Sequence, residues 1–183
     1  MALPTPVPGL VISFSFLWSH EHEGGAEEGN KTRPCTIVVA AETGEAGETE
    51  VIVAPMTTRP PESPELAVEV PPRVRNHLGL GTDRCWIICS ELNRFVWPGY
   101  DLAAIPGQPG RFDHGMLPRR LFEPVSSAID HGLFRPGTAS SGLVPTGILM
   151  KAGNAPKLTS GGSLSKVWNI PWPCENSRSD RWI

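Results

Sequence analysis

The chain has 183 residues, a length that suits one domain with an appendage or two very small domains. Hydrophobic residues make up only 39% of it, and the 20 prolines and 19 glycines predict that a sizeable fraction lies in loops or lacks regular structure. The net charge of −3 excludes a chain that is basic throughout, and it counts against a large nucleic-acid-binding footprint.

Sequence periodicity predicts six strands and two helices. Residues 10–18 alternate between a strongly apolar face and a mixed one, which is the period of a strand. Apolar β-branched runs at 35–41 and 50–56, joined by a short acidic turn, predict a hairpin. The remaining predicted strands are residues 66–70, 85–89 and 93–97, and the predicted helices are one that begins at Pro71-Pro72 and stops at Gly79 and one at residues 118–130. Residues 20–31 and 101–115 are expected to be loops.

Short strands with hairpin connections, one short helix and a closing helix predict a mainly β fold, a small, curled, antiparallel barrel. Residues 1–134 form the predicted domain. From residue 135 no period is sustained, and 21 of the last 49 residues are Gly, Pro, Ser or Thr, so residues 135–183 are expected to be a disordered, low-complexity tail. The charge divides at the same point, with 10 Lys/Arg and 17 Asp/Glu before it, and 6 and 2 after it.

The sequence predicts a cytoplasmic protein without a membrane segment. The apolar run at residues 10–18 is too short to span a bilayer, and no basic residues precede it as they would in a signal peptide. The four cysteines form neither a disulfide nor a zinc pattern, which favours reduced and packed thiols.

Two motifs resemble ligand sites but favour simpler interpretations. Residues 78–83 contain Gly-Leu-Gly but lack the third glycine and the βαβ setting of a dinucleotide loop, which predicts a helix cap and a turn. The run His20-Glu21-His22-Glu23 offers metal-ligating side chains, but a lone His-x-His in an acidic loop is more often solvated. We expect no metal and no cofactor.

A polar stretch leads directly into the strand at 35–41. Pro34 fixes its own φ and keeps Arg33 extended, so Arg33 lies at the mouth of that strand. The next strand ends at Thr57, and if the two strands pair, the Arg33 guanidinium and the Thr57 hydroxyl converge at one rim of the sheet. Either residue alone is most often a solvent-exposed side chain, so the prediction depends on the two together.

Residues 9–101 resemble the PemK/MazF family of toxin–antitoxin toxins. The resemblance rests on an opening strand, an acidic loop, an Arg-Pro dipeptide that begins an apolar strand, and a strand that ends in Met-Thr. These are residues 10–18, residues 27–31, Arg33-Pro34 with residues 35–39, and residues 53–57. Residues 86–94 are similar to a later strand and polar segment of the family. The segments 59–72 and 135–183 have no counterpart in it.

The resemblance implies an SH3-like barrel that forms a homodimer, cleaves single-stranded RNA without a metal, and is neutralised by an antitoxin through which it also reaches operator DNA. Arg33 would stabilise charge on the phosphate oxygens during attack by the 2′-OH, and Thr57 would add a hydrogen bond. The general base is not decided, and Glu28, His20 and His22 are its candidates. We group Glu28 with Arg33 and Thr57 as a predicted catalytic residue. The implied substrate-binding residues are Thr58, Arg59, Arg94 and Trp97.

The acidic residues of this chain complicate that function. Eight of them fall within residues 21–28 and 42–50, and beside Arg33 they would repel a phosphate chain. RNA is then expected to bind across another face, near Arg59, Arg73, Arg75 and Arg94, with Trp97 for base stacking. The alternative function is a non-catalytic barrel module that binds an antitoxin or an antitoxin–operator complex.

Overall fold

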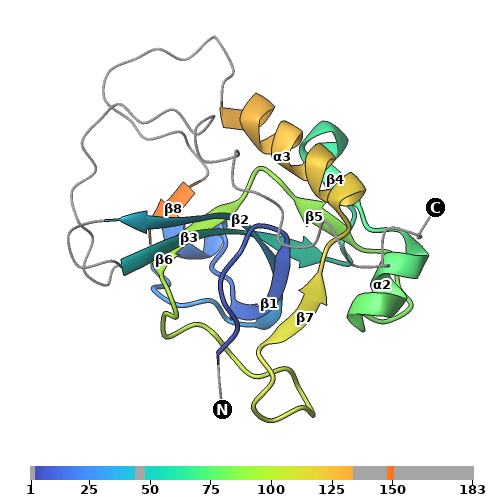
Figure 1. The fold of residues 1–183 in the computed structure, drawn as a ribbon. Helices are drawn as coiled ribbons and strands as arrows, with labels where there is room; N and C mark the ends of the chain where they lie inside the picture. The colour runs from blue at the N-terminus through green and yellow to red at the C-terminus, as the bar shows by residue number, and fades with distance from the viewer. Residues whose placement is uncertain (1–2, 44–47, 134–147, 151–183) are drawn as a thin grey trace.

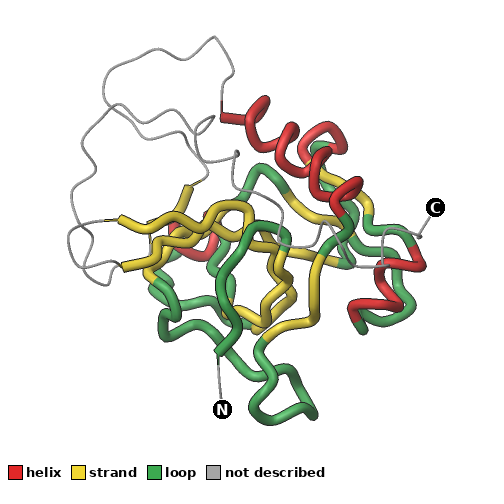
Figure 2. Tube along the Cα trace, in the orientation of Figure 1, coloured by secondary structure: helices red, strands yellow, loops and turns green. Residues whose placement is uncertain are grey.

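Within the described residues, which are 3–43, 48–133 and 148–150 of the computed structural model, eight strands form one curled sheet. The strands follow the order β4-β5-β3-β2-β1-β7, and β6 pairs with β3 off this path. Their bounds are β1 Leu10–Ser15, β2 Thr32–Thr43, β3 Glu48–Thr57, β4 Ala67–Glu69, β5 Trp86–Ile88, β6 Leu92–Val96, β7 Asp113–Met116 and β8 Ile148–Met150. The sheet curls into an antiparallel half-barrel (Figures 1 and 2), which confirms the predicted fold class.

Two of the three helices in the described residues lie on the side of β4, β5 and β7 (Figure 1). The three helices are α1 Ser19–Glu23, α2 Pro72–Leu78 and α3 Arg119–Leu133, with a 3-10 turn, η1, at Pro64–Leu66. Helix α2 carries proline in its first turn and ends at Gly79, whose φ of 65° is the left-handed conformation that glycine adopts without strain, as predicted. Helix α3 contains Pro124 and lies against β4 and η1. None of the helices in the described ranges is both long and apolar enough to cross a bilayer.

Two segments predicted as loops contain short regular elements. Helix α1 occupies the start of residues 20–31, where the Glu21 carboxylate accepts a hydrogen bond from the backbone N–H of Trp18 at 3.2 Å and so caps the first turn. Strand β7 lies at the end of residues 101–115 and pairs antiparallel with β1. Its polar, glycine-containing sequence has no strand period, so tertiary pairing at the sheet edge produces this strand.

The apolar residues pack into two clusters, one on each face of the central strands. The alternation predicted for β1 is confirmed, because its even-numbered residues enter one cluster and Val11 enters the other. We call the first the aromatic core; its buried members are Leu10, Ile12, Phe14, Phe16, Cys35, Ile37, Ala40, Val51, Val53 and Phe95. The second cluster includes buried residues of α2 and α3, so these helices cover the opposite face.

The predicted tail lies mostly outside the described residues. The described part of it, β8, pairs in parallel with β6, with Asn93 opposite Leu149.

Stability is expected to fall as the pH is lowered through the range of His114. This half-buried side chain on β7 has its Nδ1 3.1 Å from the carbonyl oxygen of Leu78, at the end of α2. Burial lowers the pKa of His114 below the ordinary 6.5. The unfolded chain therefore binds a proton more readily, so the contribution of His114 is complete above pH 6.5 and is lost as the pH falls below it.

Urea unfolding of the wild type at pH 7.5 and 5.5 measures this dependence. His114→Gln, which keeps a donor for the Leu78 carbonyl, is expected to show a smaller drop in midpoint, whereas His22→Gln on exposed α1 keeps the full drop. An equal drop in urea midpoint between pH 7.5 and 5.5 for the wild type and His114→Gln would contradict this assignment.

Candidate active site

Strands β2 and β3 are paired along most of their length but part at one end. Their pairing ends where Cys35 lies opposite Pro55. Beyond that point the first residues of β2 pair with β1, whereas the last two residues of β3 pair with β5. Proline has no backbone N–H, so neither Pro34 nor Pro55 can donate a ladder hydrogen bond. The two strands thus separate beside two residues that lack a backbone donor.

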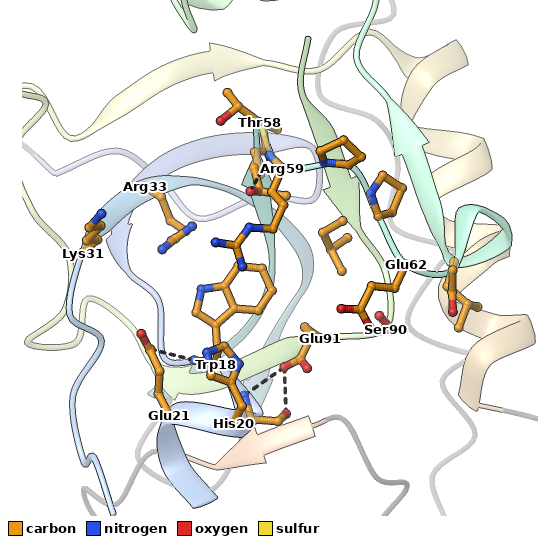
Figure 3. Close-up of a pocket in the computed structure, with 18 of the residues that line it drawn as sticks. Trp18, His20, Glu21, Lys31, Arg33, Thr58, Arg59, Glu62, Ser90 and Glu91 are labelled. Atoms are coloured by element: carbon orange, nitrogen blue, oxygen red, sulfur yellow. Dashed lines mark hydrogen bonds between the residues drawn. The ribbon is translucent and has the colours of Figure 1, made fainter. Parts of the chain in front are cut away.

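The separated strand ends border a cleft of about 1230 Å³, and Arg33 and Thr57 both line it. Alternate residues of a strand share a face, so Arg33 shares a face with Cys35, and Thr57 shares one with Pro55. Because Cys35 and Pro55 are cross-strand partners, Arg33 and Thr57 project from the same side of the sheet. Figure 3 shows the Arg33 guanidinium directed into the opening. The predicted convergence of these two side chains is therefore present.

The Arg33 guanidinium is held against an aromatic ring and keeps a donor unused. Its Cζ lies 5.1 Å from the centroid of the Trp18 ring, within the range of a cation–π contact. Its Nε is buried without a hydrogen-bond partner, and none of the ion pairs among the described residues involves Arg33. A buried donor without a partner is costly unless a ligand supplies an acceptor. The side chain is thus suited to receive an anion.

Trp18 is a cleft residue that the sequence analysis did not select. It continues the alternation of β1 beyond the end of the strand, and its ring packs edge-on against Phe16 at 5.2 Å between centroids. Phe14 lies directly opposite Arg33 in the β1–β2 register. The sequence could have predicted this position. The two-residue period of β1 places Phe14, Phe16 and Trp18 on one face, and Arg33 lies on the same face of the neighbouring strand.

The end of β3 supplies the second polar edge of the cleft. Thr57 Oγ1 accepts a hydrogen bond from the backbone N–H of Arg59 at 3.1 Å, which fixes the hydroxyl while leaving its own proton to donate. Thr58 and Arg59 are exposed and also line the cleft, as does Lys31 from the start of β2. Three cations, Lys31, Arg33 and Arg59, therefore line one opening together with three threonines, Thr32, Thr57 and Thr58.

The cleft is also lined by four glutamates, and two of them accept hydrogen bonds from neighbouring residues. Glu21 accepts from the Trp18 N–H, and Glu91 accepts from the N–H and the hydroxyl of Ser19 at 3.1 and 2.7 Å. Glu62 is exposed and lies near Glu91 in Figure 3. His20 is exposed and stacks on Trp18, with 6.3 Å between ring centroids. His20 is therefore the histidine of the cleft lining, and it contacts the ring that also contacts Arg33.

Glu28, predicted as a catalytic residue, is not among the residues that line the cleft. It is exposed, and the next residue explains the path of the loop. A Cβ on Gly29 would lie 2.3 Å from the carbonyl oxygen of Phe16, so the loop passes β1 at a distance that only glycine permits. This contact fixes the loop against the strand. His22 is likewise absent from the cleft lining, which leaves His20 among the three candidate bases.

Arg94 and Trp97, predicted as substrate-binding residues, lie away from the cleft. Arg94 is 8% exposed and forms an ion pair with Glu50, so its charge is used within the fold. Trp97 packs against the aromatic core, and its ring centroid lies 6.3 Å from that of Phe95. Both residues were selected as a basic and an aromatic side chain suited to RNA. However, β6 pairs Arg94 with Ile52 and runs toward the β2–β3 turn, away from Thr57.

The two acidic stretches expected to repel a phosphate at Arg33 differ in their distance from it. Glu21 and Glu23 of the first stretch line the cleft, whereas Glu42 of the second lies near the far end of β2. Glu42 lies nine residues from Arg33 on the same strand, which corresponds to about 30 Å at ~3.3 Å per residue. Charges at that separation are screened at physiological salt, where the Debye length is about 8 Å. Screening therefore weakens the repulsion expected from Glu42. Of the expected alternative face, Arg59 belongs to the cleft, Arg73 is exposed, and Arg75 and Arg94 are buried.

The described residues contain no group of three or more His, Cys, Asp or Glu side chains placed to hold a metal ion. Cys35, Cys85 and Cys89 are buried and form no disulfide among the described residues. Burial raises the pKa of Cys85, and it raises the pKa of Cys89 to about 12, so these two thiols stay protonated at neutral pH. The chemistry of the cleft therefore belongs to its arginines, lysine, threonines, histidine and carboxylates.

Comparisons of the chain with protein-family models, with curated proteins and with solved structures found no match.

Proposed function

We propose that this chain is the toxin of a toxin–antitoxin pair, that it acts in the cytoplasm, and that it cleaves single-stranded RNA in the Arg33 cleft without a metal. The observation that carries the proposal is the buried Arg33 Nε, which has no hydrogen-bond partner, in a side chain that lines the same cleft as Thr57. The resemblance of residues 9–101 to PemK/MazF toxins supplies the reaction class. It further suggests a homodimer and an antitoxin partner that links the toxin to operator DNA.

The cleft residues suit transfer of a phosphodiester to the neighbouring 2′-oxygen. The 2′-oxygen forms a bond to phosphorus, and the bond from phosphorus to the 5′-oxygen breaks, which leaves a 2′,3′-cyclic phosphate and a 5′-hydroxyl. Negative charge increases on the non-bridging oxygens as the five-coordinate state forms. The planar donor fork of Arg33 and the hydroxyl of Thr57 stabilise that charge, and Lys31 and Arg59 add positive potential.

The proton of the 2′-hydroxyl requires an acceptor, and we assign it to His20. A neutral imidazole accepts a proton near pH 7, and His20 contacts the ring that holds Arg33. Glu21 and Glu91 already accept hydrogen bonds from the backbone around α1. The leaving 5′-oxygen receives a proton from water, and an arginine can stabilise it by donating a hydrogen bond.

Purified full-length protein incubated with a mixed RNA pool, with and without EDTA, tests the proposal. We expect cleavage in both conditions, with 2′,3′-cyclic phosphate ends, because no step requires a metal. A pool with 2′-O-methyl groups at every position should stay intact, since it lacks the attacking hydroxyl. Cleavage of the methylated pool, or cleavage that EDTA abolishes, would contradict the mechanism.

A non-catalytic binding module is the second candidate. Four glutamates, Glu21, Glu23, Glu62 and Glu91, line the same cleft as the three cations, and such a mixed surface also suits a protein segment with both charges. Intact RNA together with tight, salt-sensitive binding of the antitoxin would favour this function.

A further inference from the structure

Asn93 forms a two-point contact with the backbone of Leu17, across 76 residues of sequence. Asn93 is 1% exposed on β6, and its Oδ1 accepts from the Leu17 N–H at 3.0 Å while its Nδ2 donates to the Leu17 carbonyl at 2.9 Å. The ladder between β1 and β2 has already ended, at Ser15 opposite Thr32. The side-chain amide therefore substitutes for the missing strand partner of Leu17.

The residues that follow Leu17 form part of the cleft. Trp18 contacts the Arg33 guanidinium, and Ser19 donates two hydrogen bonds to the Glu91 carboxylate. The turn before β6 and the first residues of that strand thus hold the segment 17–19 from one side, with Asn93 buried and Glu91 at the cleft (Figure 3). The Trp18 ring in turn occupies one side of Arg33.

We propose that Asn93 is a positioning residue for the cleft: it fixes the Leu17 backbone, which sets the Trp18 ring, which seats the Arg33 guanidinium. Its effect on catalysis rests on the proposed function, but the seating of Arg33 does not. A displacement of about 1 Å at a reacting group can lower a rate by about 100-fold. The position of the Arg33 guanidinium therefore affects the rate of cleavage in addition to its charge.

The chemistry of the amide makes the contact sensitive to small changes. The Leu17 backbone presents one N–H donor and one carbonyl acceptor, and the asparagine side chain supplies the matching acceptor, Oδ1, and donor, Nδ2. Asn93→Asp keeps the size but offers two acceptors, so a carboxylate oxygen faces the Leu17 carbonyl and the segment is pushed away. Asn93→Ser removes the donor without adding a charge, and it serves if the aspartate variant does not fold.

The first test is the ¹⁵N–¹H signal of Arg33 Nε in the full-length protein, assigned by its disappearance in Arg33→Lys. The Trp18 ring current should shift this signal from its unstructured position. We expect Asn93→Asp and Asn93→Ser to move it toward that position. Thr36→Val, which replaces another fully buried polar side chain, controls for general loss of stability and should leave it unchanged. A folded Asn93 variant with an unmoved Arg33 signal would overturn the proposal.

The second test is steady-state cleavage of RNA. Asn93→Asp should lower kcat by about 10- to 100-fold with KM within about twofold, whereas Thr36→Val should leave kcat unchanged. Trp18→Leu should lower kcat similarly, and the double variant should lose no more than either single one, since both act through Arg33. Additive losses would overturn the proposed chain of contacts. If the wild type cleaves no RNA, the proposed function fails, and the Arg33 signal alone decides the role of Asn93.

Discussion

Replacing Arg33 by lysine is expected to lower kcat/KM for RNA cleavage by about 100- to 1,000-fold, although the positive charge is kept. Removal of one well-placed donor to a developing oxyanion commonly has an effect of this size. Lysine cannot reproduce the planar fork that addresses two phosphate oxygens, nor the flat contact with the Trp18 ring. Single-turnover cleavage of a short RNA that contains one mapped site measures the change.

Arg84 provides a matched control for this substitution. Its Cζ also lies 5.1 Å from the centroid of a tryptophan ring, that of Trp86, but it pairs with Glu69 on the surface and does not line the cleft. Arg84→Lys should therefore retain the wild-type rate. A wild-type rate in Arg33→Lys, or an equal loss in both variants, would remove Arg33 from the mechanism.

Replacing Arg94 by methionine is expected to lower the free energy of unfolding by about 3–5 kcal/mol. Arg94 and Glu50 are diagonal neighbours on β6 and β3, and their side chains are only 9% and 16% exposed. The substitution leaves the Glu50 carboxylate in a poorly solvated position without the arginine partner of this ion pair. Urea unfolding at pH 7 measures the loss.

The double variant Arg94→Met/Glu50→Leu should recover most of that stability, because no unpaired charge is then left at the site. Arg119→Met disrupts the exposed pair with Glu123 and should change stability by about 1 kcal/mol or less. The kcat of folded Arg94→Met should equal that of the wild type. A stable Arg94→Met protein with weakened RNA binding would instead restore the substrate-binding role that the sequence suggested.

The parts of the fold that the sequence predicted depend on local patterns. The alternation along β1, the hairpin of β2 and β3, and the stop of α2 at Gly79 each follow from residues close together in the chain. The convergence of Arg33 and Thr57 was also predictable, because a hairpin places the start of its first strand beside the end of its second.

The missed features depend on contacts between distant segments. The bonds from Asn93 to Leu17 span 76 residues, and no periodicity in either segment indicates them. Strand β7 forms because β1 offers an edge, although its own residues favour a loop. The distance from Glu42 to Arg33, in contrast, is predictable from sequence, because it follows from their separation along one strand and the rise per residue.

The separation of β2 from β3 has a consequence for how this domain could diversify. The opening is a property of the backbone, because it begins where β2 and β3 stop pairing, beside Pro34 and Pro55. Most side chains around it come from segments that precede or follow strands, and such segments tolerate substitution better than the packed interior. Catalytic and purely binding descendants of one ancestor could therefore share the same frame and differ at only a few positions around its rim.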